Sequence, residues 1–318
     1  MDYVIETREL TKVYGTKIAC DKISIAVKPG QVYGFLGPNG AGKSTCIKML
    51  TGLVYPTAGG GTVLGQPLGS VAARKKMGYL PELFRYQDWM TGRDLLKFHT
   101  RLFRLPMDEG RIDQILKLVG LAGQDKFKVG SYSKGMQQRI GLGCALLPEP
   151  ELLFLDEPTS ALDPVGRKEV RDIISGLQKA GMTVFLNTHL LSEVETLCDS
   201  VTIINHGVVA RSASMSELLL QRVNLEIRAA GWDEDILAEI RRRFQTEPVT
   251  SAEGKVTLTL DGHERVPEIA SFLVSRNVAL YELTPQGETL ENVFIRLVGA
   301  SGDAIVAEDA EAKEGAVG

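Results

Sequence analysis

The sequence from Gly37 to Thr45 reads GPNGAGKST and matches the phosphate-binding pattern G-x-x-x-x-G-K-[S/T] at every specified position. A strand-like apolar run, Val32 to Leu36, precedes it, and an amphipathic helical pattern with Ile47, Leu50 and Val54 on its apolar face follows. Glycines permit a tight turn in which backbone N–H groups and the N-terminus of the next helix point at phosphate oxygens. The stretch therefore predicts a nucleoside triphosphate site.

Each residue of this loop is a candidate phosphate contact. These candidates are Gly37, Pro38, Asn39, Gly40, Ala41, Gly42, Lys43, Ser44 and Thr45. Lys43 is expected to reach the β- and γ-phosphates, and the Ser44 hydroxyl to ligate Mg²⁺. An ordinary glycine-rich turn is the alternative, which the flanking strand and helix disfavour.

Three further strand-like segments end in polar residues. The apolar run Leu152–Leu155 has no polar alternation, as expected of a strand buried on both faces, and it ends in Asp156 and Glu157. A similar strand, Thr183–Asn187, ends just before Thr188 and His189, and a third covers 201–205. Ligands of open α/β sheets bind beyond the carboxyl ends of the strands, so the loop, the carboxylates and His189 are expected to converge on one site. For the carboxylate pair alone, the alternative is a solvated strand end.

Other parts of residues 1–220 predict smaller elements around this sheet. Short strands are expected at Val4–Thr7 and Ile23–Val27, and Tyr14 stands before a turn, where it is either a packing residue or a stacking surface for a base. Between about residues 84 and 148 the apolar spacing becomes helical, which indicates a helical insert between two strands of the sheet.

Composition narrows the class of protein. The 318 residues suggest one large or two ordinary domains, and 44% apolar content is enough for a full core. The net charge of -4 gives no sign of a nucleic-acid-binding surface. No apolar run approaches the roughly 18–20 residues that span a bilayer, and the start Met1-Asp2-Tyr3 lacks the layout of a signal peptide. A soluble, cytoplasmic chain is expected.

The four cysteines are scattered, with no C-x-x-C pair. They are Cys20, Cys46, Cys144 and Cys198. In a reducing compartment they are expected to be buried apolar residues, in preference to disulfides or metal ligands.

A second unit is expected over residues 221–299. Its pattern alternates strand, helix, strand, helix and strand, with another strand near Val249, and suits a small ferredoxin-like domain. The expected elements are strands Leu225–Ala229, Lys255–Leu260 and Val278–Leu283 and helices Asp233–Phe244, Val266–Ser275 and Thr289–Val298. Residues 300–318 are rich in Ala, Gly and acidic residues and are expected to be a disordered tail.

The phosphate loop, the segment Tyr132–Arg139 (YSKGMQQR) and the segment Leu152–Pro158 occur in that order. In this combination, residues 3 to 220 resemble the ATP-binding subunit of an ABC transporter. The C-terminal unit, with LTP from Leu283 and LENVF from Leu290, more loosely resembles the extension of the type-2 exporter branch, which includes drug, antibiotic, sodium and polysaccharide exporters.

The resemblance implies a fold and a set of roles. The fold would be a P-loop NTPase with a parallel-sheet core, an antiparallel β subdomain and a helical insert. Asp156 would hold Mg²⁺, Glu157 would polarise the attacking water, and His189 would hydrogen-bond the γ-phosphate. Tyr14 would stack on adenine, and Asp163 would lie in a loop that crosses between two subunits. The cofactors implied are ATP and Mg²⁺.

The resemblance also implies partners. Two copies would sandwich two ATPs head to tail, with Ser133 and Gly135 of one copy closing on the γ-phosphate held by Lys43 of the other. Complete motifs on one chain favour a homodimer. The helical insert would contact a separate multi-span permease at the cytoplasmic face of the membrane, where the chain would be peripheral. Candidate contacts, for which core packing is the alternative, are Leu83, Phe84, Tyr86 and Trp89.

The sequence departs from the commonest family pattern in its signature segment and at Glu82. Lys134 and Met136 replace the usual glycine and glutamine of L-S-G-G-Q, while Ser133 and Gly135 are kept. Glu82 replaces a glutamine; its carboxylate can accept from water or bind Mg²⁺ but cannot donate a hydrogen bond. A glutamate here also occurs in the type-2 exporter branch.

An exporter ATPase is therefore the leading hypothesis. Its rivals are an import-system ATPase with a regulatory C-terminal domain, a soluble ABC ATPase acting on DNA or ribosomes, and a nucleotide sensor with little turnover. The sequence has neither a coiled-coil insert nor a basic face for the second rival, and Asp156, Glu157 and His189 argue against the third.

Overall fold

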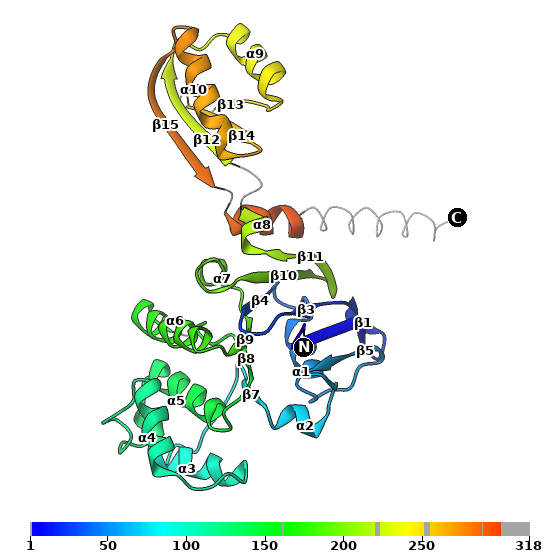
Figure 1. The fold of residues 1–318 in the computed structure, drawn as a ribbon, viewed down its shortest axis with the longest axis vertical. Coiled ribbons are helices and arrows are strands. Elements are labelled where there is room, and N and C mark those ends of the chain that lie inside the picture. Colours follow the sequence, from blue (N-terminus) through cyan, green and yellow to red (C-terminus); the bar gives the residue numbers. More distant parts are fainter. Residues whose placement is uncertain (1, 161, 220–222, 251–254, 288, 300–318) are drawn as a thin grey trace, which may run out of the picture. The chain divides into compact units, whose positions relative to one another are not determined.

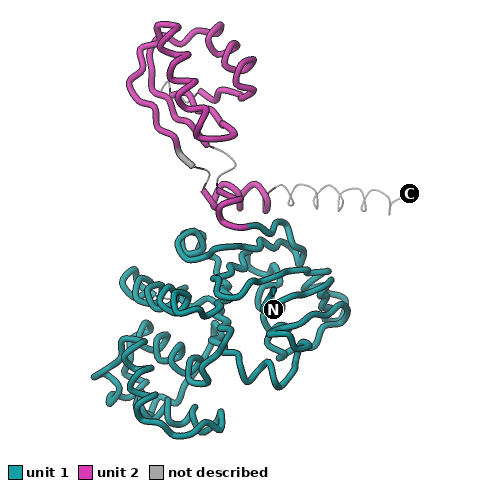
Figure 2. Tube along the Cα trace, in the orientation of Figure 1, with its two compact units in different colours: residues 1–213 teal, residues 214–318 magenta. Residues whose placement is uncertain are grey.

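The computed structural model describes residues 2–160, 162–219, 223–250, 255–287 and 289–299. The chain forms two compact units, residues 1–213 and residues 214–318 (Figure 2). The tail expected to be disordered, residues 300–318, lies outside the described residues. Within the described part, no helix is both long and apolar enough to cross a bilayer.

A mainly parallel sheet forms the centre of the first unit (Figure 1). Its order is β11-β10-β4-β9-β8-β7, and the five strands from β10 to β7 run parallel. The strands are β4 (Val32–Leu36), β7 (Met77–Leu80), β8 (Leu152–Asp156), β9 (Thr183–Asn187), β10 (Ser200–Asn205) and β11 (Val208–Ser214). Every residue of β4, β8 and β9 is buried, so the expected parallel core is confirmed. Phe35, Phe154 and Phe185 join these three strands, with ring centroids 5.4 Å apart in each neighbouring pair.

An antiparallel sheet makes the second layer of this unit. Its strands are β1 (Ile5–Tyr14), β2 (Lys17–Ile23), β3 (Ala26–Val27), β5 (Ala58–Val63) and β6 (Gln66–Pro67). The expected single strand over Ile23–Val27 is wrong, because β2 ends at Ile23 and β3 begins at Ala26. The buried Thr7 hydroxyl lies in the break, where it donates to Ile23 O and accepts from Ile25 N.

Helix α1 (Lys43–Leu50) follows β4 as expected but ends before Val54. Gly52, in the left-handed region at φ 72, follows its end and packs so closely on Gly69 that a Cβ would lie 2.7 Å from the Gly69 Cα. Val54 still packs against the core around α1 from outside the helix.

The helical insert lies between β7 and β8 (Figure 1). The helices of the first unit are α1, α2 (Val71–Arg74), α3 (Gly92–Leu102), α4 (Glu109–Leu118), the 3₁₀ turn η1 (Val129–Ser131), α5 (Lys134–Leu146), α6 (Pro164–Lys179) and α7 (Leu191–Leu197). Helix α5 begins at Lys134, where the Ser133 hydroxyl accepts a hydrogen bond from Met136 N and caps the helix.

The second unit contains an antiparallel sheet in the order β13-β14-β12-β15. Its elements are α8 (Met215–Leu219), β12 (Val223–Ala230), α9 (Glu234–Phe244), β13 (Val249–Thr250), β14 (Lys255–Leu260), η2 (His263–Arg265), α10 (Val266–Ser275), β15 (Ala279–Gly287) and a helix over 290–299. The β-α-β-β-α-β succession with this strand order is the ferredoxin-like arrangement that the sequence predicts. Apolar residues of α9 and α10 pack on one face of the sheet and form its core.

All four cysteines are buried and free. Burial raises the pKa of each thiol, to about 12 for Cys20. The expectation of buried apolar residues is therefore confirmed.

An ion-pair network centred on Arg93 links α3 to α4 and to the buried Asp125 in the helical insert. Arg93 of α3 bonds Glu109 at 3.1 Å and Asp113 at 2.6 Å, both on α4, and Asp125 at 2.8 Å. The Asp125 side chain is only 6% exposed. Burial alone would raise the pKa of Asp125, but the hydrogen bonds from Arg93 and from backbone N–H groups hold it below its ordinary value.

Replacing Arg93 with methionine should therefore destabilise the insert. Arg93→Met leaves the Asp125 carboxylate buried without its cation, and we expect the free energy of unfolding to fall by about 2 kcal/mol in denaturant titrations at neutral pH. Because the folded pKa of Asp125 is lowered, its contribution is present above its ordinary pKa and is lost as pH falls through the folded value. The difference in the free energy of unfolding between Arg93→Met and the wild type should therefore become smaller at acid pH. Arg101→Met, at an exposed position of the same helix, is the control; equal losses for both variants would contradict the prediction.

Candidate active site

The phosphate loop connects β4 to α1 and depends on close backbone packing. A Cβ on Gly42, which has φ 102, would lie 2.1 Å from Ala19 O of β2, and one on Gly37 would lie 2.4 Å from Ile204 O of β10. No side chain fits at either position. Gly42 also caps α1 without any side-chain hydrogen bond, which leaves the helix N-terminus available to an anion.

Lys43 is the cation of this loop. It is 7% exposed, and its Nζ donates to Gly37 O at 2.8 Å and Pro38 O at 3.2 Å. Burial lowers the pKa of Lys43, while Glu157, Asp156 and Glu82 act in the opposite direction. The ammonium group is thus held over the loop beside three carboxylates.

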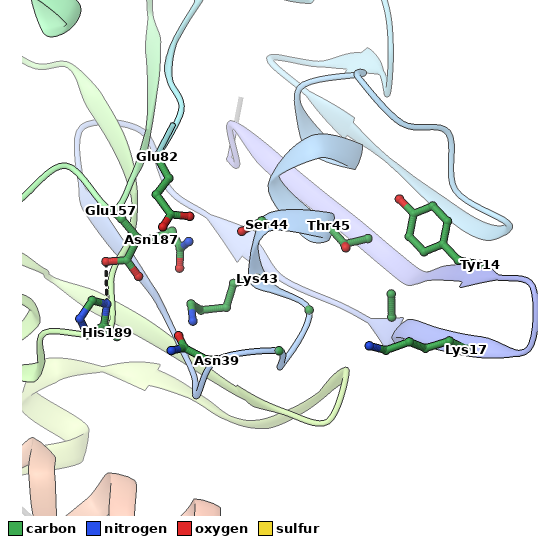
Figure 3. Close-up of a pocket in the computed structure, with 13 residues that line it drawn as sticks. Tyr14, Lys17, Asn39, Lys43, Ser44, Thr45, Glu82, Glu157, Asn187 and His189 are labelled. Carbon is green, nitrogen blue, oxygen red and sulfur yellow. Dashed lines mark ion pairs between the residues drawn. The ribbon is translucent and has the colours of Figure 1, made fainter. Parts of the chain in front are cut away.

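The loop forms one wall of a cavity of about 470 Å³ (Figure 3). The cavity is lined by Tyr14, Lys17, Ala19, Asn39, Gly40, Gly42, Lys43, Ser44, Thr45, Glu82, Glu157, Asn187 and His189. In Figure 3, Tyr14 and Lys17 lie at one end, Glu157 and His189 at the other, and Lys43 and Ser44 between them. The convergence expected at the carboxyl ends of the strands is therefore present. A cavity of this size suits a nucleotide.

Asp156 is the last residue of strand β8 and Glu157 follows it, and the two carboxylates face different partners. Asp156 is 3% exposed and accepts a hydrogen bond from Asn187 Nδ2 at 2.5 Å. Burial raises the pKa of Asp156; the hydrogen bond from Asn187 opposes the rise, and the negative charges of Glu82 and Glu157 add to it. Asp156 does not line the cavity itself, but its partner Asn187 does.

Glu157 is held in an unusual backbone conformation. Its φ is 52, in the left-handed region, and its backbone N donates to Asn187 O at 2.9 Å. Non-glycine residues rarely adopt this region and do so most often at functional sites. The turn directs the Glu157 carboxylate into the cavity, although its side chain is only 8% exposed.

His189 lies against this carboxylate. Its Nδ1 is 2.8 Å from Glu157 Oε2, which is ion-pair distance, yet the geometry makes no hydrogen bond, and Oε2 has no hydrogen-bond partner among the described residues. A buried carboxylate oxygen without a hydrogen-bond partner can accept a proton from a water molecule in the cavity. The arrangement suits a base beside a phosphate site.

Ser133, Gly135 and Asp163 are not part of this cavity. They line a second one of about 400 Å³ with Lys134, Arg139, Leu162, Val165, Gly166 and Glu169. Asp163 caps α6 by accepting from Gly166 N at 3.0 Å, as Ser133 caps α5. Within one chain these predicted nucleotide contacts thus form a separate group.

Of the other predicted loop contacts, Gly37, Pro38 and Ala41 do not line the cavity. Three residues that the sequence did not mark as candidates do line it, namely Lys17, Ala19 and Asn187. Asn187 is the end of a buried strand, so the rule that selected Asp156 could have found it. Lys17 and Ala19 lie on β2, whose pairing with β1 brings them beside Tyr14; no local motif marks them.

Comparison with known proteins agrees with this geometry. Residues 20–160 match the family model described as ABC transporter. The chain is 38% identical over 307 residues to an uncharacterized ABC transporter ATP-binding protein of Synechocystis, covering 92% of this chain and 84% of that protein. It is 33% identical to the linearmycin resistance ATP-binding protein of Bacillus subtilis, with 93% and 98% covered.

A solved ATP-binding subunit of an ABC transporter has the same fold. It superimposes with a TM-score of 0.61 at 27% identity, covering 68% of this chain and 91% of that one. The chain therefore belongs to the ABC transporter ATP-binding proteins, a family of nucleotide-binding ATPases, as the extent of these matches, the phosphate loop and the acidic strand end all indicate.

Proposed function

We propose that this chain hydrolyses Mg²⁺-ATP as the peripheral subunit of an exporter, working as a dimer on a separate membrane permease at the cytoplasmic face. The observation that carries the proposal is the cavity that joins Lys43, Ser44 and Glu157. The proposed direction of transport is supported by the relative named for linearmycin resistance, which aligns over nearly its whole length.

The residues of the cavity fit a magnesium ion held together with phosphate. No cluster of three or more His, Cys, Asp or Glu side chains in the described ranges could hold a metal on its own. Ser44, Glu82 and Asp156 nevertheless offer the oxygen ligands that Mg²⁺ prefers, and the ion commonly takes its remaining ligands from phosphate and water. Burial and the negative charges of Glu82 and Glu157 raise the pKa of Asp156. A bound cation would offset this excess of negative charge. When bound, Mg²⁺ would neutralise charge on the phosphate oxygens.

Different residues of the chain would bind the nucleotide and activate the attacking water. Lys43 and the N-terminus of α1 bind the phosphates, and Tyr14, 48% exposed at the opposite end of the cavity, offers a ring face to the base. Glu157 accepts the proton of the attacking water, and His189, beside it, is placed to hydrogen-bond a phosphate oxygen. The left-handed turn at Glu157 fixes the base relative to the loop.

A second copy would complete the site. Ser133 and Gly135 lie at the start of α5, and Asp163 at the start of α6, and together they line a cavity that does not include the phosphate loop. A helix N-terminus with a serine hydroxyl suits a phosphate, so these residues can close on a nucleotide held by another subunit.

The helical insert offers a surface for the permease. Leu83 and Trp89 are 87% and 71% exposed. Phe84 and Tyr86 are half-buried; they pack against each other, with ring centroids 5.0 Å apart, and against Gly141 of α5. Leu83, Phe84 and Tyr86 share a cavity of about 730 Å³ with Val129 and Gln137. We assign the permease contact to this cavity and its exposed rim, with Phe84 and Tyr86 also serving as packing residues.

Glu157→Gln tests the catalytic assignment. The amide cannot accept the proton of water, so we expect hydrolysis to fall by about 10²–10⁴-fold, while ATP binding persists and a closed dimer accumulates on a sizing column. Glu151→Gln, an exposed change before the start of the same strand, is the control. Turnover of Glu157→Gln at the wild-type rate would show that the base lies elsewhere.

Lys43→Ala tests the phosphate contact. Removing this cation should raise the ATP dissociation constant by about 10- to 100-fold, as expected for a hydrogen bond to a charged group worth about 1.5–3 kcal/mol. Equilibrium binding of a fluorescent ATP analogue measures the effect. Lys48→Ala, exposed on the same helix, should leave the affinity unchanged, and equal affinity for both variants would remove Lys43 from the site.

Affinity purification tests the permease. Tagged Glu157→Gln, extracted in detergent with ATP, should co-purify with a multi-span membrane protein in near-equal amount, as identified by mass spectrometry. Leu83→Asp in this background should lose that protein and keep ATP binding, whereas Val71→Asp, an equally drastic change at a 60% exposed position, should retain it. Ribosomal or DNA-associated proteins with no membrane partner would refute the exporter.

A further inference from the structure

Glu193 is a buried carboxylate that none of the roles above uses. It lies in the first turn of α7, is 2% exposed, and accepts a short hydrogen bond at Oε2 from the hydroxyl of Thr159. Its second oxygen, Oε1, is buried and has no hydrogen-bond partner among the described residues. Burial raises the pKa of Glu193; the Thr159 hydroxyl, Arg171 and Arg167 oppose the rise, and Glu157 adds to it.

The hydrogen bond between Thr159 and Glu193 is one of two contacts that join the segment carrying the proposed base to the segment around the start of α7. Thr159 is 1% exposed and follows Glu157 by two residues, while Glu193 follows His189 by four. The Glu157 carboxylate and His189 Nδ1, 2.8 Å apart, make the other link between the same two segments. The loop after β8 is therefore tied at two points, to His189 just before α7 inside the cavity and to Glu193 in the first turn of α7 outside it.

The segment after Glu157 is also held at its far end. Arg167 of α6 donates from Nε to Leu162 O at 3.0 Å, and its charge lowers the pKa of Glu193. Asp163, next along the chain, caps α6. The loop that carries both the base and the proposed contact to a second copy is thus fixed to α7 through Thr159 and to α6 through Leu162.

Stability alone is a poor explanation for a charged group at this position. Burying a carboxylate with one oxygen unpaired carries a desolvation cost, and a neutral residue of similar size would commonly be as stable or more so. An anionic acceptor does, however, make a stronger and shorter bond to a hydroxyl than an amide does. The benefit is geometric, since Glu157 occupies a left-handed backbone conformation that its surroundings must hold.

We propose that Glu193 is a positioning residue for ATP hydrolysis, which holds Thr159 and thereby keeps Glu157 aimed at the attacking water. The inference rests on the proposed role of Glu157. Glu193 does not line the nucleotide cavity, so it acts through Thr159 and not on the nucleotide.

Kinetics of Glu193→Gln in the full chain test the inference. Loosening a base by a fraction of an ångström affects chemistry more than binding, so we expect kcat to fall by roughly 10- to 100-fold. The ATP dissociation constant should stay within about twofold, and the melting temperature should stay at or above that of the wild type. Glu195→Gln, exposed on the same helix, is the matched control and should keep the wild-type kcat.

Variants of Thr159 test whether loss of the hydrogen bond between Thr159 and Glu193 is what lowers kcat. Thr159→Val removes the hydroxyl at nearly constant volume and should lower kcat as Glu193→Gln does, whereas Thr159→Ser keeps the hydroxyl and should restore most of it. If the two residues act as one pair, the double variant Thr159→Val/Glu193→Gln should be little worse than either single change. Additive losses would overturn the inference.

Comparison with Glu157→Gln separates failure of this inference from failure of the proposed function. Wild-type kcat in Glu193→Gln and Thr159→Val, with hydrolysis abolished in Glu157→Gln, would refute the positioning role and leave the catalytic base in place. Normal hydrolysis in Glu157→Gln would instead refute the base. Parallel loss of kcat, ATP affinity and melting temperature in Glu193→Gln would show a merely structural residue and also overturn the inference.

Discussion

The site is organised by the balance between one buried cation and the carboxylates around it. Lys43 is fixed by two carbonyls of its own loop, and Glu82, Asp156 and Glu157 act on it from the ends of neighbouring strands. Lys43 and the carboxylates lower the cost of burying one another, whereas the carboxylates repel each other, and phosphate with its metal would complete the balance. The parallel sheet is what makes this possible, because its strands all end at the same edge.

Backbone packing sets the precision of this arrangement. The phosphate loop approaches β2 and β10 so closely that Gly42 and Gly37 have no room for a side chain. The base, by contrast, is on a strained turn, and its position depends on a backbone hydrogen bond to Asn187 of β9 and on the side-chain hydrogen bond from Thr159 to Glu193 of α7. The phosphate side of the site is therefore held by main-chain packing, and the catalytic side by a main-chain hydrogen bond together with a few buried polar groups. Small changes in those groups offer a way to alter turnover without altering binding.

One chain presents two separate halves of the proposed ATP sandwich. The cavity at the phosphate loop and the cavity at Ser133, Gly135 and Asp163 are distinct within the subunit. Ser133 and Asp163 each cap a helix, so the residues proposed to meet a second copy also fix the starts of α5 and α6. The loop from Glu157 to Asp163 connects the two cavities through the chain, and Thr159 and Leu162 anchor it in between.

The sequence by itself determined the elements whose geometry is local. The phosphate loop was predictable because its glycines, its lysine and its helix N-terminus are contiguous, and β4, β8 and β9 because a strand buried on both faces is apolar throughout. The ferredoxin-like unit was predictable from its alternating strand and helix periods, and β14 and α10 have the bounds expected from the pattern.

Only the tertiary structure decided contacts between residues far apart in the chain. The Thr7 hydroxyl divides the segment 23–27 into two strands and leaves no local signal, whereas the end of α1 is marked locally by Gly52, which adopts a left-handed conformation just after the C-cap. Asn187 joins the site through Asp156, 31 residues away, and Glu193 through Thr159, 34 residues away. Periodicity and motifs describe neighbours along the chain, whereas a hydrogen bond between two loops depends on how the sheet brings those loops together.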